Sequence, residues 1–183
     1  DIFKQSKRKT KTKDFFPYGS DERQFCSPGI NLDVGVFMRT PYYEFEEYHT
    51  ADDNLKFVSK TALKDSLSML LKIISAIEIT KNIKPSPKIK KIHSKQSDIY
   101  LNLKPKCEPQ LGKRKLYRNI SKRRLVDEDD SQDLIEISIL WILNYSDGNH
   151  SLKDISKISN LPIKLLKHSS QLLLKKSLLK KLN

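Results

Sequence analysis

Residues 132–183 read QDLIEISILWILNYSDGNHSLKDISKISNLPIKLLKHSSQLLLKKSLLKKLN, and this stretch carries the clearest folding pattern in the chain. Its first part, 134–145, is apolar on almost every side, which predicts a helix buried at the centre of a small domain. Apolar residues at helical spacing follow on both sides of a tight turn, and a short run typical of a strand comes last. These two helices and the strand are expected at about 152–158, 163–173 and 177–182. Three helices and a strand in this order predict a winged helix-turn-helix over residues 132–183.

The first part of the chain has a different pattern. Apolar and polar side chains alternate over 30–39, which predicts a strand there. Ser59 is a suitable N-cap, and leucines and isoleucines at helical spacing then predict a long helix over about 60–79. A strand, a loop and a long helix in this order are typical of the closing unit of an α/β layered fold. We therefore expect an α/β domain over residues 1–82.

Residues 83–131 separate these two parts and are interrupted by prolines. Residues 81–126 carry fifteen basic and two acidic residues, so this segment alone matches the net charge of +13 of the whole chain. No periodic pattern lasts here, although a short strand is compatible with the residues at 99–103. We expect a basic linker that packs on the first domain.

A basic chain attracts phosphates, so a nucleic acid has to be considered as a partner. Lys164 and Lys167 lie in the second helix of the helix-turn-helix pattern, where lysines can hold the phosphate backbone. However, no Arg, Asn or Gln lies near the start of that helix to read base edges. Base-stacking aromatic residues are scarce in the basic segment. The sequence therefore favours an assembly role for this domain, on a catalytic domain or in a homo-oligomer, over nucleic-acid recognition.

The composition excludes several other classes of protein. No apolar run approaches the roughly 18 residues of a membrane span, so no membrane partner is expected. The two cysteines, Cys26 and Cys107, are far apart, and lone thiols fit a reducing, cytoplasmic setting. The chain begins with Asp1 rather than Met, which indicates a processed product or a piece of a longer chain.

His49 lies in the loop EYHTADDN at 47–54, where carboxylates surround it just before the predicted long helix. A neutral imidazole binds zinc, and a nearby carboxylate fixes its tautomer. A lone histidine is more often not a ligand, and the other three histidines have no partners at ligand spacing. A second polar cluster at 21–23 reads Asp-Glu-Arg, for which a structural ion pair is the simpler interpretation.

Four runs of this sequence resemble, in order and spacing, the C-terminal part of a bacterial aminopeptidase-like family that is often encoded near polysaccharide-biosynthesis genes. The runs are YGSDERQFCSPGINLDVGVFMRT, EYHTADDNLKFVS, CEPQLGKRKLY and LWILNYSDGNHSLKDI. Members of the family join a zinc aminopeptidase domain to a C-terminal winged helix. The resemblance implies an α/β fold: the C-terminal portion of a zinc aminopeptidase-like three-layer domain, followed by a winged helix-turn-helix.

The same resemblance implies where a site lies. The His-Thr-x-x-Asp element at 49–53 is similar to the last metal-ligand motif of zinc aminopeptidases, which implies that His49 is a zinc ligand. Asp53, Asp21 (from a Ser-Asp element similar to one that lines the active site) and Arg39 are implied as neighbours of the ligand or of the pocket. A site of this kind holds two zinc ions and needs further ligands and a glutamate base. Residues 1–48 contain no histidine. We therefore expect those groups upstream, and no catalytic residue in this chain.

The resemblance thus implies a zinc-dependent aminopeptidase-like hydrolase that cleaves a peptide or amide bond, with an incomplete active site in this chain. The alternative is a winged-helix module that binds DNA or assembles proteins without catalysis.

Overall fold

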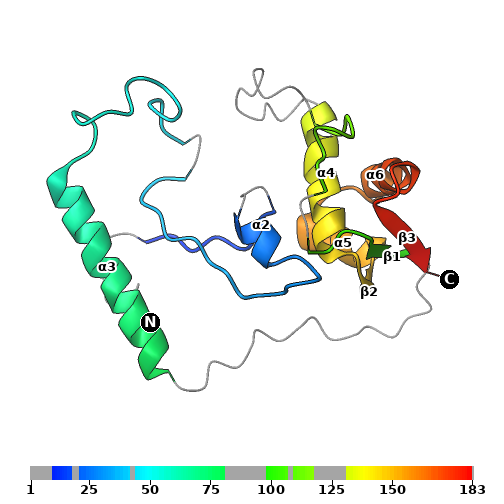
Figure 1. Cartoon of the computed structure of the whole chain (residues 1–183), viewed down its shortest axis with the longest axis horizontal. Coiled ribbons are helices and arrows are strands. Elements are labelled where there is room, and N and C mark those ends of the chain that lie inside the picture. The colour runs from blue at the N-terminus through cyan, green and yellow to red at the C-terminus, as the bar shows by residue number, and fades with distance from the viewer. Residues whose placement is uncertain are drawn as a thin grey trace. The chain divides into compact units, whose positions relative to one another are not determined.

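The computed structural model describes residues 10–17, 21–41, 44–80, 98–106, 109–117 and 131–182. The chain divides into two units, whose helices and strands are labelled in Figure 1. The first unit is Asp1–Asp14 with Val36–Lys88, and the second, called here the winged-helix unit, is Phe15–Gly35 with Ile89–Asn183. Ser20, Cys107 and most of the expected basic linker lie outside the described residues.

Three short strands form an antiparallel sheet in the winged-helix unit. β1 (Ile99–Asn102) lies between β2 (Asp147–Ser151) and β3 (Leu179–Leu182), although it comes first in the chain. Its pairing with β3 is continuous, whereas its pairing with β2 contains an irregularity. The short strand that the sequence allowed near 99–103 is therefore the middle strand of this sheet, within the segment expected to be a linker.

Three helices complete the winged-helix unit: α4 (Ser131–Tyr145), α5 (Leu152–Ser159) and α6 (Ile163–Lys175). The central position predicted for α4 is confirmed, because residues 139–143 are all buried and the helix packs against both α5 and α6. Burial of aliphatic side chains is the main favourable term in such a fold. The other buried apolar residues are Tyr100, Leu111, Leu152, Ile155, Leu166, Leu173, Leu178 and Leu179.

Local signals set the ends of α5. Ser151 and Asp154 form a capping box, in which each side chain accepts a hydrogen bond from the backbone N–H of the other residue. Asn160 ends the helix with a φ of 62°, a left-handed conformation that asparagine tolerates. The tight turn that the sequence predicts between the last two helices is therefore present.

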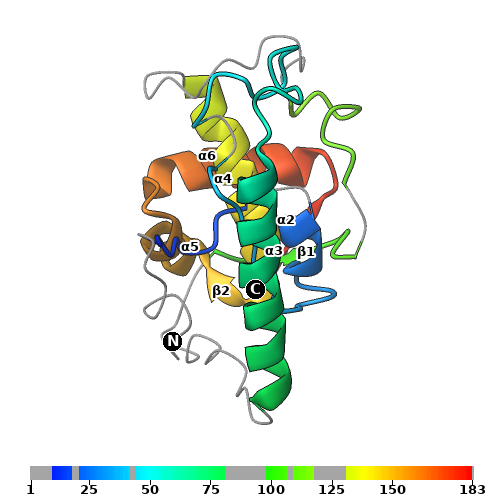
Figure 2. The ribbon, with the colours of Figure 1, turned by 90° about the vertical axis from the view of Figure 1, so that its left-hand side faces the viewer.

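The long helix predicted in the first unit is also present, as α3 (Lys60–Ile79), which Figure 2 shows along its length. The hydroxyl of Ser59 accepts a hydrogen bond from the N–H of Ala62 at 3.0 Å, as expected of the N-cap. None of the residues of α3 is buried. Neither α3 nor any other helix in the described ranges combines the length and the apolar character that crossing a membrane requires.

The strand predicted over 30–39 is absent, so this prediction is wrong. Residues 31–38 have no regular secondary structure, and Leu32, Val36 and Phe37 are exposed. A strand persists only when a neighbouring strand takes up its backbone N–H and C=O groups. No strand lies beside this segment in the described part of the chain. The alternating pattern indicates which side chains would share a face of a strand, but it does not provide the neighbouring strand that has to pair with it.

Candidate metal centre

His49 lies in a series of turns at 44–58 that leads into α3. Its backbone has a φ of 60°, and its ring stacks on Tyr48 with the centroids 4.1 Å apart and 16° between the planes. The side chain is exposed, and the imidazole makes no hydrogen bond to the rest of the described chain. Within the described residues, both ring nitrogens are therefore without a hydrogen-bond partner.

Hydrogen bonds within the loop fix the turns around this imidazole. The hydroxyl of Thr50 donates to the carbonyl of Glu47 at 2.8 Å and accepts from the N–H of Asp52 at 3.2 Å. The N–H of Asp53 donates to the carbonyl of Thr50 at 3.3 Å. The threonine of the His-Thr-x-x-Asp element thus has a local role, because its hydroxyl closes the turn through side-chain-to-backbone bonds.

The described residues do not assemble a set of metal ligands. In the ranges that the structure covers, no group of three or more His, Cys, Asp or Glu side chains could hold a metal ion. Zinc in proteins takes three or four protein ligands. This loop offers one imidazole, so these residues by themselves do not fit a zinc site.

The other candidate residues are divided between the two units. The guanidinium of Arg39 donates to the carbonyl of Ala62 at 3.3 Å, which ties the chain before the His49 loop to the first turn of α3. Asp21 is exposed and begins the short helix α2 (Asp21–Phe25) in the winged-helix unit. His49, Asp53 and Arg39 belong to the first unit.

The segment that begins at Asp21 is held against the winged helix. Nη1 of Arg23 donates to the hydroxyl of Tyr117 at 2.7 Å, and Nδ2 of Asn144 donates to the carbonyl of Arg23 at 3.1 Å. These partners are 94 and 121 positions apart in the sequence. No local pattern could have revealed these contacts.

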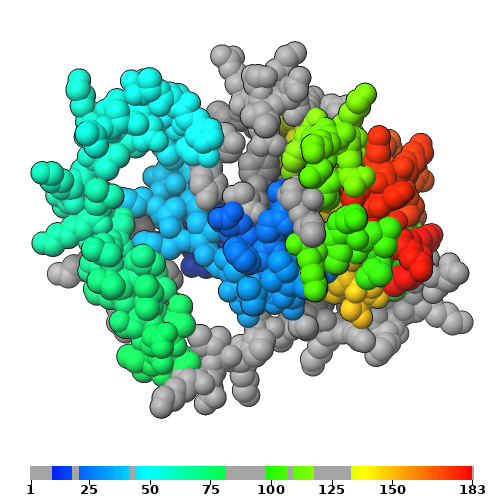
Figure 3. Space-filling view, in the orientation of Figure 1, coloured from blue at the N-terminus to red at the C-terminus, as the bar shows by residue number. Residues whose placement is uncertain are grey.

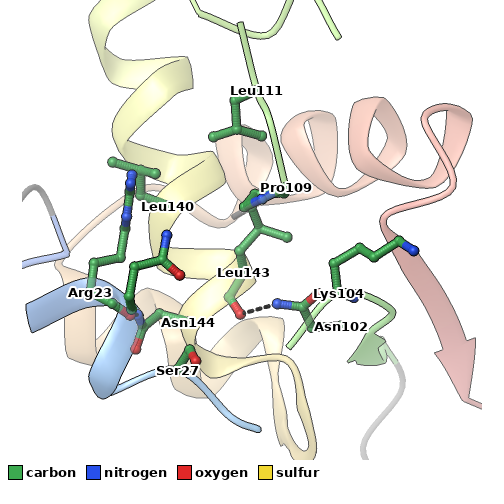
Figure 4. A pocket seen from close by; sticks show the side chains of 10 residues that line it. Arg23, Ser27, Asn102, Lys104, Pro109, Leu111, Leu140, Leu143 and Asn144 are labelled. Atoms are coloured by element: carbon green, nitrogen blue, oxygen red, sulfur yellow. Dashed lines mark hydrogen bonds between the residues drawn. The ribbon is translucent and has the colours of Figure 1, made fainter. Parts of the chain in front are cut away.

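A small cavity lies along this contact, and Figure 4 shows the side chains around it. Its volume is about 30 Å³, and its polar lining comes from Arg23, Gln24, Ser27, Asn102, Lys104 and Asn144. That volume has room for about one water molecule. The cavity is therefore too small to be a site for a peptide or amide substrate.

The two lysines considered for phosphate binding, Lys164 and Lys167, lie exposed on α6. Nζ of Lys167 is 3.6 Å from the carboxylate of Asp98, which also accepts a hydrogen bond from Lys181 at 2.8 Å. The hydrogen bond from Lys181 lowers the pKa of Asp98, although partial burial of that carboxyl acts in the opposite direction. Asp98 thus compensates part of the positive charge on this face, which weakens its attraction for phosphate.

We expect the chain to bind duplex DNA weakly and without sequence preference. Asp98→Asn removes the negative charge beside Lys167 and Lys181. It should strengthen binding and steepen the slope of the logarithm of the association constant against the logarithm of the salt concentration by about one. Fluorescence-anisotropy titrations at about 50 and 200 mM salt would measure both effects. Sequence-selective binding by the unmodified chain would contradict this expectation.

A titratable pair that the sequence patterns did not reveal lies in β2. Nδ1 of His150 is 3.0 Å from Oδ1 of Asp147, which also accepts the backbone N–H of Asn149 at 2.8 Å. Burial raises the pKa of Asp147, but the hydrogen bonds from His150 and Asn149 outweigh it and bring the value to about 2. The hydrogen bond to Asp147 raises the pKa of His150, against the effect of burial. The local signal for the pair is the Asp-x-x-His spacing at 147–150.

Folding stability should depend on pH through this pair. The pKa of His150 is higher in the folded state than its usual value of 6.5. Protonated His150 therefore contributes its full stabilisation below pH 6.5, and this stabilisation is lost as the pH rises through the folded-state pKa. The ionised carboxylate of Asp147 contributes its full stabilisation above pH 3.8, and this stabilisation is lost as the pH falls towards 2. We expect stability to fall by about 1 kcal/mol, and the melting temperature by about 5 °C, between about pH 6 and pH 9.

His150→Gln should remove most of that fall, as measured by thermal melting at several pH values. His168→Gln, on the exposed face of α6, is the matched control and should leave the pH profile unchanged. A wild-type melting temperature that is flat over this range would refute the role of the pair.

Comparison with known protein families matches both parts of the chain. Residues 1–80 match a domain of unknown function (DUF4910), and residues 98–181 match a winged helix-turn-helix family. The second match includes β1 as well as the three helices. The winged helix-turn-helix that the sequence predicts is thus confirmed, and so is the mixed helix-and-sheet class of the fold.

A relative from Clostridium acetobutylicum carries the provisional name polysaccharide biosynthesis protein with aminopeptidase-like domain. It is 42% identical over 167 residues, which are 91% of this chain and 33% of the relative. A crystal structure of a protein from the same organism, provisionally described as a peptidase, matches 99% of this chain and 34% of its own, with 38% identity and a TM-score of 0.40. The chain therefore spans about a third of each of these proteins. The resemblance predicted from the sequence is confirmed by the identity to a protein named for its aminopeptidase-like domain and by the match of residues 98–181 to a winged helix-turn-helix family.

Proposed function

We propose that this chain is the C-terminal portion of a zinc-dependent aminopeptidase-like hydrolase that cleaves a peptide or amide bond. The observation that carries the proposal is the 42% identity, over 91% of the chain, to a relative named for its aminopeptidase-like domain. In this proposal His49 is one ligand of a site for two zinc ions, and Asp53, Asp21 and Arg39 lie near the metal or along the pocket. The other ligands and the general base come from residues outside this chain.

The His49 loop suits the role of a single ligand held in place by its own turns. The bonds of Thr50 fix the backbone on the C-terminal side of His49, and the stacked ring of Tyr48 restricts rotation of the imidazole. Arg39 ties the preceding chain to α3. A ligand positioned in this way loses less conformational entropy when a metal binds.

The exposed apolar side chains of α3 support the proposal that the first unit is part of a larger domain. The helix carries an apolar stripe at helical spacing, and every side chain of the stripe is exposed. Figure 3 shows α3 in space-filling form, in teal to green. An uncovered apolar face of this length is unusual in a finished fold and marks a surface that packs against protein. We propose that the aminopeptidase-like part covers the stripe in a three-layer α/β fold. The stripe consists of Leu63, Leu67, Leu70, Leu71, Ile74 and Ile77.

The test uses an extended chain, in which an aminopeptidase-like part precedes this sequence so that the whole has the length of the relative. We expect about two zinc ions per chain by elemental analysis, and hydrolysis of leucine p-nitroanilide. His49→Ala should remove zinc and lower kcat/KM by at least about a hundredfold, whereas His168→Ala should change neither. Retention of the full zinc content and activity after His49→Ala would overturn the proposal.

A further inference from the structure

Residues 24–32, called here the apolar turn, fold back on themselves at the end of α2. Three large apolar side chains of this turn are exposed: Phe25 by 46%, Ile30 by 37% and Leu32 by 53%. The N–H of Leu32 donates to the carbonyl of Phe25 at 2.8 Å, and the N–H of Ile30 donates to the carbonyl of Ser27 at 3.0 Å. The three side chains therefore belong to one compact turn.

The winged helix fixes the backbone of the apolar turn. The hydroxyl of Ser27 donates to the carbonyl of Pro105 at 2.7 Å, and Ser27 itself is buried. The N–H of Gly29 donates to the same carbonyl at 3.3 Å, and a Cβ atom on Gly29 would lie 2.9 Å from the carbonyl carbon of Pro105. No side chain fits there unless the two segments move apart. Because the turn is held in this way, a partner that covers it has little backbone to order.

The apolar turn also lacks charge. Residues 24–32 read QFCSPGINL and contain no Asp, Glu, Lys or Arg, although these residue types make up 31% of the chain. The centre of a protein interface is depleted of charged residues and enriched in aromatic residues. A nucleic acid binds through cations that neutralise its phosphates, and this turn has none. The chemistry of the turn therefore fits an apolar protein surface.

The area of the turn indicates which protein surface covers it. At these exposures the three side chains offer at most about 400 Å². A contact between two copies would bury about twice that area, which is less than the roughly 1,200 Å² of a stable interface between separate molecules. A surface in the same polypeptide needs less area, because linkage raises its effective concentration. Since this chain matches 33% of its relative, most of the proposed hydrolase lies outside the chain and is available to cover the turn.

We propose that Phe25, Ile30 and Leu32 are the docking face by which the winged-helix unit packs on an apolar surface of the aminopeptidase-like part. This inference rests on the proposed function, which places that part in the same polypeptide, and it assigns the contact to one turn. It gives the winged helix an assembly role within one molecule that needs no nucleic acid. Gly29 holds the docking face in position through its contact with Pro105.

The first test is hydroxyl-radical footprinting of the 183-residue chain and of the extended chain. The modification rates of Phe25 and Leu32 should be at least about threefold lower in the extended chain, as for side chains at the centre of an interface. Leu101, which is 38% exposed on β1, is the reference and should keep its rate. Equal rates at Phe25 and Leu32 in the two chains would overturn the inference. Rates that fall as the concentration of the 183-residue chain rises would also overturn it, because a second copy would then cover the turn.

The second test places a carboxylate in the docking face. In the extended chain, Leu32→Asp should return the modification rate of Phe25 to that of the 183-residue chain, because an unpaired carboxylate is costly to bury. Asn31→Asp is the matched control, since it adds the same charge at the neighbouring exposed position without removing an apolar side chain, and it should leave Phe25 protected. In the 183-residue chain, Leu32→Asp should not change urea unfolding, which separates a loss of docking from a loss of folding. Equal rates at Phe25 in the two variants of the extended chain would contradict the docking face.

Zinc content and hydrolysis of leucine p-nitroanilide, measured on the same extended chain, test the proposed function separately. A protected turn in a chain without zinc or activity would refute the hydrolase and leave the docking face in place. An unprotected turn in an active, zinc-loaded chain would refute the docking face and leave the hydrolase in place.

Discussion

Leu166→Ala should lower the free energy of unfolding of the winged-helix unit by about 3 kcal/mol. Leu166 lies on α6, is 0% exposed and belongs to the core that α4, α5 and α6 share. Truncation removes its dispersion contacts, and the surrounding helices collapse only in part around the cavity that remains. Urea unfolding followed by the fluorescence of Trp141, the buried tryptophan of α4, would measure the loss.

Leu103→Ala is the matched control for this measurement, because it removes the same atoms from the same unit. Leu103 directly follows β1 and is 42% exposed. Its backbone N–H donates a hydrogen bond to the carbonyl of Leu178 at 2.9 Å, which the substitution preserves. We expect a loss of less than about 1 kcal/mol. Equal losses for the two variants would show that the core does not lie where the structure places it.

A carboxylate on the apolar stripe of α3 should act differently in the 183-residue chain and in the extended chain. In the 183-residue chain Leu67 is exposed, so Leu67→Asp should leave the unfolding of the winged-helix unit unchanged. In the extended chain the proposal buries the stripe, and an unpaired carboxylate there should cost about 3 kcal/mol or more. Thermal melting of both chains, with and without the substitution, would measure the difference.

Lys72→Asp provides the comparison, since Lys72 is exposed on α3 but lies outside the stripe. It should be tolerated in both chains to within about 0.5 kcal/mol. If Leu67→Asp and Lys72→Asp were equally mild in the extended chain, the stripe would not be covered there, and the larger domain proposed around α3 would lose its support.

The helices were predictable from the sequence because their signals are local. Ser59 and the spacing of leucines and isoleucines place α3 correctly, and the all-round apolar character of 134–145 identifies α4 as the buried helix. Capping and helical periodicity act over a few residues, so one sequence contains the whole signal. The winged helix-turn-helix follows from the order of these elements.

Strands were predicted less well, because a strand depends on a partner that its own residues do not specify. The segment 30–39 has clear alternation and forms no strand, whereas β1 has a weak pattern and becomes the middle of a sheet. β1 is ordered by β2 and β3, which lie far along the chain. Pairing over such distances is set by the tertiary fold and not by local preference.

The candidate site shows the same difference between local signals and long-range contacts. The turn at His49 could be read from neighbouring residues, and its role as a metal ligand stays a prediction. The contact of Arg23 with Tyr117 joins residues 94 positions apart and could not be read from the sequence. Asp147 and His150 are three positions apart in the sequence, so their spacing could have been noticed, but their burial could not.

The middle position of β1 has a consequence for how this protein can be divided. A polypeptide that starts at residue 132 would keep α4, α5 and α6 but would leave β2 and β3 on either side of a missing strand. Their backbone N–H and C=O groups would be open to pairing with other molecules, which is a route to aggregation. During folding, the sheet forms only when β1, which precedes α4 in the chain, pairs with both β2 and β3. The rate of sheet formation therefore depends on the closure of a long loop.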